Sequence, residues 1–116
     1  MMKMEIKLDE ARMDKDGFVV ASAWKIIDKI MEETDGHLTK EILEDGAVMY
    51  SSVPEYTNTF GYFGGAYIIL QDIEWFAKYV TKWLWYDNDS DETQPFEYSD
   101  VLAKERTRNP LFRRNL

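Results

Sequence analysis

The chain has 116 residues, 45% of them hydrophobic and 15% aromatic, which predicts one folded domain and excludes a catalytic barrel or a full dinucleotide-binding fold. It carries 22 acidic and 14 basic residues, a formal charge of −8 that disfavours direct binding to nucleic acid or to an anionic membrane. The absence of cysteine excludes disulfides, thiol catalysis and thiolate metal sites.

The N-terminal residues predict a half-buried β-strand. Met2, Met4, Ile6 and Leu8 alternate with polar residues, and a period of two places these four side chains on one face. The polar residues between them are expected to face solvent.

Two further elements follow along the chain. From about residue 20 to 33 the apolar residues recur at the spacing of an amphipathic helix. Asp45-Gly46 is typical of a two-residue hairpin turn and predicts strands near 39–44 and 47–52. Residues 52–65, with three glycines and several aromatic side chains, are expected to form a loop that folds back over the core.

A second, longer helix is predicted from about residue 68 to 86. Its apolar face adjoins an aromatic stripe. Together they cover a wider arc of the helix surface than a helix that packs against a single surface needs to bury. We therefore expect an aromatic patch that contacts the rest of the chain or a partner, formed by Trp75, Tyr79, Trp83, Trp85 and Tyr86. The element order β-α-β-β-α predicts a small α+β domain, with two helices on one face of a three-stranded antiparallel sheet.

Charge divides the chain into two segments. Residues 1–100 hold 21 acidic and 9 basic residues and form the expected compact acidic body. Residues 101–116 hold one acidic and 5 basic residues and form a basic C-terminal tail. This tail is expected to begin with a short helix capped by Ser99 or Asp100, and to dock on the body. Its apolar anchors are Leu111 and Phe112.

Two stretches of the body contain acidic residues and no basic ones, between Lys40 and Lys78 and between Lys82 and Lys104. They could line one surface and offer carboxylates where a basic protein expects phosphates, or they could simply keep the chain soluble. The candidate partner-binding residues of this acidic face are Glu41, Glu44, Asp45, Glu55, Asp87, Asp89, Asp91 and Glu92.

Asp72 is the candidate polar group of a pocket. In the predicted helix it falls within the apolar arc beside Tyr79 and Trp83, where a carboxylate needs a hydrogen-bond donor or a raised pKa. This placement suggests an alternative function, a small ligand-binding or hydrolytic domain with an aromatic pocket around Asp72.

The sequence contains no complete catalytic, cofactor or metal-binding motif: the alternating acidic residues at 87–91 have the spacing of a calcium loop but lack the glycine and the glutamate that an EF-hand needs. We therefore expect a non-enzymatic interaction protein that binds, and could inhibit, a basic partner such as a nucleic-acid-processing protein. The N-terminus lacks the apolar stretch of a signal peptide, and the longest apolar run, residues 66–70, cannot span a membrane, so we expect a cytoplasmic protein. A self-associating aromatic patch would also be compatible with a homodimer.

Overall fold

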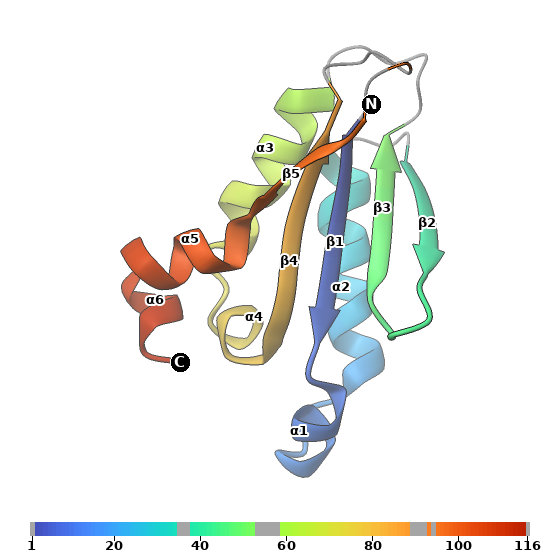
Figure 1. Cartoon of the computed structure of the whole chain (residues 1–116). Coiled ribbons are helices and arrows are strands. Elements are labelled where there is room, and N and C mark those ends of the chain that lie inside the picture. Colours follow the sequence, from blue (N-terminus) through green and yellow to red (C-terminus); the bar gives the residue numbers. More distant parts are fainter. Residues whose placement is uncertain (1, 35–37, 53–58, 89–92, 94, 116) are drawn as a thin grey trace.

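The computed structural model describes residues 2–34, 38–52, 59–88, 93 and 95–115. Five antiparallel strands form one sheet in the order β2-β3-β1-β4-β5 (Figure 1). The predicted α+β class is confirmed, whereas the predicted number of three strands is wrong. The strands are β1 (Met2–Leu8), β2 (Leu38–Ile42), β3 (Val48–Ser52), β4 (Val80–Asp87) and β5 (Glu97–Asp100).

Strands β1 and β2 are parallel to each other, because each is antiparallel to β3, which lies between them. The first four strands and their helices therefore form the split β-α-β arrangement of ferredoxin-like folds. Such a topology describes the scaffold and assigns no activity.

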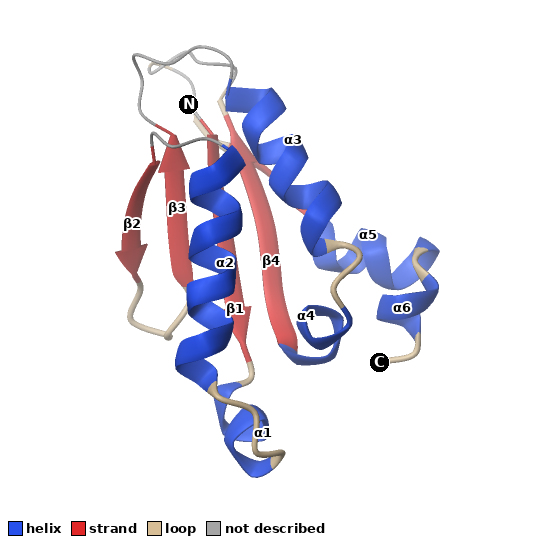
Figure 2. Cartoon of the chain, turned by 180° about the vertical axis from the view of Figure 1, so that it is seen from behind, coloured by secondary structure: helices blue, strands red, loops and turns tan. Residues whose placement is uncertain are grey.

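The long helices α2 and α3 cover one face of the sheet (Figure 2), and no described helix covers the other (Figure 1). Strand β1 shows why: Met2, Met4, Ile6 and Leu8 are all buried towards these helices, as their alternation predicts. The helices are α1 (Glu10–Lys15), α2 (Val20–Thr34), α3 (Thr59–Leu70), α4 (Glu74–Tyr79), α5 (Val101–Arg108) and α6 (Pro110–Arg113). Within the described residues, none of them is long and apolar enough to cross a bilayer.

The other locally encoded elements match their predictions closely. Helix α2 occupies the predicted range, and the hairpin of β2 and β3 turns at Asp45-Gly46. Its loop has three residues rather than the expected two, because Gly46 N donates to Leu43 O and Gly46 adopts a φ of 87°. Helix α5 begins at Val101 and is capped by Asp100, whose carboxylate accepts a hydrogen bond from Ala103 N.

The predicted helix over residues 68–86 is wrong. Helix α3 ends at Leu70, a turn follows, and residues 80–87 form strand β4 between β1 and β5. These residues are rich in β-branched and aromatic side chains, which fit a pleated surface, and β1 needs a second hydrogen-bonded neighbour. The aromatic residues that recur every four positions therefore belong partly to a short helix and partly to a strand.

The predicted loop over residues 52–65 is wrong in its second half, because α3 begins at Thr59. Phe63, Ala66 and Leu70 recur at helical spacing and are buried in the core. Their burial offsets the intrinsic cost of glycines within the helix.

Gly64 gives a direct test of this helix. A Cβ at Gly64 would meet nothing within 4 Å, so Gly64→Ala should raise the free energy of unfolding by about 0.5–1 kcal/mol. Gly46→Ala is the matched control of opposite sign, because a positive φ should make alanine there cost about 1–2 kcal/mol. Urea denaturation of both variants measures the difference. A destabilising Gly64→Ala would contradict the helix.

Candidate functional site

The uncovered face of the sheet carries a polar network centred on Glu5. This side chain lies among the polar positions of β1 that were expected to face solvent, yet Glu5 is only 5% exposed. Tyr86 donates its hydroxyl hydrogen to Glu5 Oε1 at 2.9 Å, and Lys82 Nζ lies 3.0 Å from Glu5 Oε2. Cross-strand pairing of β1 with β4 brings these three side chains together.

Lys82 extends the network from the sheet to the hairpin loop. Its Nζ donates to Asp45 Oδ2 at 2.8 Å, and Lys7 Nζ lies 3.9 Å from the same oxygen. The bonds to Asp45 and then to Glu5 raise the pKa of Lys82 well above its usual range. Nucleophilic and general-base lysines need a lowered pKa, so this lysine serves as a fixed cation.

Asp45 predicts a measurable pH dependence of stability. Its pKa is lowered by the bond from Lys82, then by the bond from Ala47 N. A carboxyl group with a lowered folded-state pKa stabilises the fold above its unfolded pKa of about 4, and loses that contribution as pH falls through the folded value. The urea midpoint should therefore fall more steeply between about pH 5 and pH 2 in the native chain than in Asp45→Asn. Asp72→Asn is the control with the same change in charge, because it removes an exposed carboxylate that forms no ion pair among the described residues; equal slopes in the native chain and both variants would contradict the bond.

A shallow groove of about 460 Å³ adjoins this network where β1 ends. It lies between the end of β1, the start of α1 and the start of β4, and its lining residues are Lys7, Leu8, Asp9, Glu10, Ala11 and Thr81. Asp9 caps α1 by accepting a hydrogen bond from Arg12 N, which turns the chain so that Glu10 faces the hairpin. Glu10 Oε2 lies 4.0 Å from where a Cβ on Gly46 would be.

Glu10 therefore links the groove, which it lines, to the hairpin loop at Gly46. Glu10 comes from α1, Glu41 from β2, and Glu44 and Asp45 from the loop. We call these four residues the acidic hairpin end. Glu10, Glu41 and Glu44 are exposed and form no ion pair among the described residues, so their charges remain uncompensated. Glu10 is the member that the sequence did not indicate, since only the tertiary fold brings it to the loop.

The predicted acidic face is divided by the fold. Glu41, Glu44 and Asp45 lie together at the hairpin end. Asp87 lies at the opposite end of the sheet, where β4 pairs with Met2 of β1. The other four predicted members lie outside the residues whose side chains the structure describes: Glu55, Asp89, Asp91 and Glu92.

The predicted aromatic patch is divided as well. Trp83 and Tyr79 are buried in the core, and Trp75 is half-buried on α4. Trp85 and Tyr86 are neighbours in β4, so their side chains point to opposite faces of the sheet. The stripe expected on one helix does not exist, because the residues belong partly to a strand.

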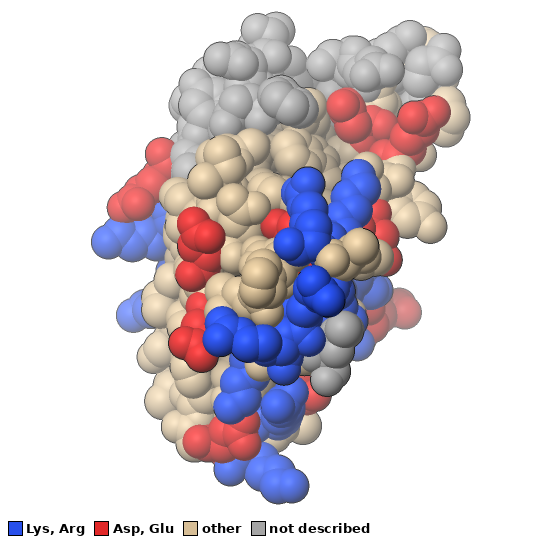
Figure 3. Space-filling view, turned by 90° about the vertical axis from the view of Figure 1, so that its left-hand side faces the viewer, with Lys and Arg blue, Asp and Glu red and all other residues tan. Residues whose placement is uncertain are grey.

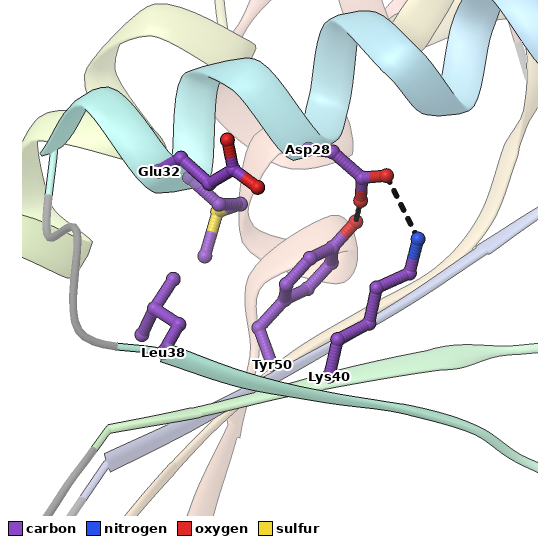
Figure 4. Close-up of a pocket in the computed structure, with 6 residues that line it drawn as sticks. Asp28, Glu32, Leu38, Lys40 and Tyr50 are labelled. Atoms are coloured by element: carbon purple, nitrogen blue, oxygen red, sulfur yellow. Dashed lines mark hydrogen bonds and ion pairs between the residues drawn. The ribbon is translucent and has the colours of Figure 1, made fainter.

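The structure does not place Asp72 where the sequence predicted it, within the apolar arc of a helix. Asp72 is exposed, in the turn between α3 and α4, and does not lie in an apolar arc. A cavity of about 80 Å³ does lie elsewhere, between α2 and the hairpin (Figure 4). There Asp28 accepts hydrogen bonds from the Tyr50 hydroxyl at 2.6 Å and from Lys40 Nζ at 2.8 Å.

This cavity has room for a few water molecules and is far smaller than the ~300 Å³ of an ordinary ligand pocket. Burial, then the bond to Asp28, raises the pKa of Tyr50 well above its ordinary value, which keeps the phenol protonated. The interactions in this cavity therefore hold α2 onto the hairpin. Among the described residues, no group of three or more potential ligands is arranged to hold a metal ion.

No protein-family model matches the chain, and neither the curated proteins nor the solved structures include one that is significantly similar to it.

Proposed function

We propose that this chain is a small non-enzymatic interaction module that binds a basic protein partner through the acidic hairpin end. The observation that supports the proposal is the approach of Glu10, which lines an open groove, to Gly46 of the hairpin loop, the residue that follows Glu44 and Asp45. A lysine or arginine side chain entering this groove would lie beside Glu10, between the end of β1, the start of α1 and the start of β4. The proposed partner is a basic protein. A nucleic-acid-processing protein fits, because its surface cations bind the anionic phosphates of its substrate.

The free energies of exposed ion pairs support binding through several charges on one surface rather than through a single ion pair. An exposed ion pair contributes about 0.2–1 kcal/mol, so no single carboxylate can determine affinity. Several unpaired carboxylates on one surface accelerate association and select a positively charged partner. Their contribution falls with added salt, because exposed charges are screened over about 8–10 Å at physiological ionic strength.

The test is affinity capture from nuclease-treated lysate of the source cells, with the native chain and two triple variants. Glu10→Lys, Glu41→Lys and Glu44→Lys together reverse the unpaired charges of the acidic hairpin end without touching Asp45. The matched control reverses three exposed carboxylates elsewhere, with the same change in net charge: Glu33→Lys, Asp72→Lys and Glu97→Lys.

The proposal predicts a basic protein that the native chain and the control retain at low salt and release at moderate salt. The hairpin variant should lose it, by about tenfold or more in retained amount. Two outcomes would count against the proposal: no basic protein retained at low salt, or equal retention by both variants.

A further inference from the structure

Basic side chains gather on one face of the molecule, over the C-terminal helices and the adjoining ends of α4 and α1 (Figure 3). We call this surface the basic stripe. It consists of Arg12, Lys78, Lys104, Arg106, Arg108, Arg113 and Arg114. Half of the 14 basic residues of the chain are therefore found in one surface of an acidic protein.

Two hydrogen bonds join the stripe across elements that are distant in sequence. Arg12 Nη1 donates to Lys78 O and Arg106 Nη2 donates to Val80 O, each at 3.4 Å. These two carbonyls flank Tyr79, where α4 passes into β4, so α1 and α5 each hold one guanidinium group at this junction. Each guanidinium has five N–H donors, and one bond to a carbonyl holds it in place while leaving donors for an oxyanion.

Most of the stripe is uncompensated. Lys78 pairs with Asp16 at 3.4 Å and Arg108 pairs with Glu105 at 2.9 Å. The other five cations form no ion pair among the described residues. The seven cations and their two paired carboxylates therefore sum to a charge of +5, although the whole chain carries −8.

Local charge decides what such a surface binds. At physiological ionic strength the screening length is about 8 Å, so carboxylates on other faces act weakly on an anion at the stripe. The net charge of −8 is a sum over the whole chain, whereas the fold separates acidic and basic side chains onto different surfaces. The net charge therefore does not exclude nucleic-acid binding at the stripe.

We propose that the basic stripe binds the phosphate backbone of a nucleic acid. Five of its seven cations are arginines, whose planar donors match phosphate oxygens. The cations extend over four helices, and a phosphate backbone supplies a continuous row of single charges for them. Backbone contacts of this kind bind without reading sequence. This proposal goes beyond the binding of a basic protein and does not depend on it, since the two surfaces share no residue.

The test measures binding of the purified full chain to fluorescein-labelled oligonucleotides, single-stranded and duplex, by fluorescence anisotropy between 50 and 200 mM salt. With about five phosphate contacts, the logarithm of affinity should fall with the logarithm of salt concentration with a slope of about −4. Arg113→Glu with Arg114→Glu should weaken binding about tenfold or more and make the slope shallower by about two.

Lys25→Glu with Lys29→Glu is the matched control, with the same charge change on the exposed side of α2. It should leave the affinity within about twofold, because those lysines lie outside the stripe. Unlabelled polyglutamate of equal charge is added as a competitor. Absent binding at 50 mM salt, equal weakening by both double variants, or competition by polyglutamate as strong as by the oligonucleotide would each overturn the proposal, the last by assigning the stripe to an acidic protein.

Discussion

Replacing Trp83 with alanine is expected to lower the free energy of unfolding by about 3–5 kcal/mol. Trp83 is 0% exposed, and its ring centroid lies 5.1 Å from those of both Phe76 and Tyr67. Its indole Nε1 donates a hydrogen bond to Met4 Sδ, which belongs to the neighbouring strand. The loss combines removed apolar contact, an unfilled cavity and broken ring pairs, which is why it should exceed that of other single substitutions in the sheet.

Tyr98→Ala is the matched control, since Tyr98 also lies in a strand but is 66% exposed. It should cost less than about 1 kcal/mol by urea denaturation. Because a domain of this size is stable by only about 5–15 kcal/mol, Trp83→Ala could fail to fold, and Trp83→Phe provides the milder comparison at about 1–3 kcal/mol. Equal costs for the Trp83 and Tyr98 variants would contradict the placement of Trp83 in the core.

Phe112→Ala should lower the free energy of unfolding by about 3–4 kcal/mol, because the C-terminal segment completes the core. Phe112 is 1% exposed, and its ring lies 6.0 Å from that of Trp83 and 6.4 Å from that of Phe76. Val101 and Leu102 of α5 are buried in the same cluster. Removing the Phe112 ring leaves a cavity beside Trp83 and Phe76.

Arg113→Ala is the control for Phe112→Ala, because Arg113 is the next residue of α6 and is exposed. This substitution should change the free energy of unfolding by less than about 0.5 kcal/mol. The double variant of Trp83 and Phe112 should be non-additive by about 0.5–3 kcal/mol, because the two rings share one contact. A Phe112→Ala variant as stable as Arg113→Ala would instead support the division into a body of residues 1–100 and a tail that adds little to its core.

The elements that could be predicted are those whose signals are local. The alternation of Met2 to Leu8 places one face of β1 inward, and the turn residues Asp45-Gly46 close their hairpin. The cap at Asp100 marks the start of α5. Each depends on neighbours within a few residues, which the sequence displays directly.

Strand β4 and the first half of α3 could not be predicted, because their formation depends on contacts with residues that are distant in the sequence. The spacing of Trp75, Tyr79 and Trp83 fits a helix as well as it fits a helix followed by a strand. The free edge of β1 selects the strand, and that edge exists only in the folded sheet. Likewise the glycines before Ala66 favour a loop locally, until burial of Phe63 outweighs their cost.

The candidate site shows the same division. Glu41, Glu44 and Asp45 could be selected because they are acidic residues near one turn. Glu10 is 31 residues or more away from them along the chain, and only the cap at Asp9 and the packing of α1 direct it to the loop. The burial of Glu5 depends on Tyr86 and Lys82 across the strand pair, which a pattern of alternating polarity does not indicate.

The most direct test of the proposed function is amide hydrogen exchange of the chain, free and bound to the partner that capture retains. Binding at the acidic hairpin end predicts slower exchange in residues 8–12 and 43–47, with the exposed sides of α2 and α3 unchanged. Protection confined to α2 and α3, around the exposed Ile26, Ile68 and Ile69, would contradict it and assign the partner to the helical face.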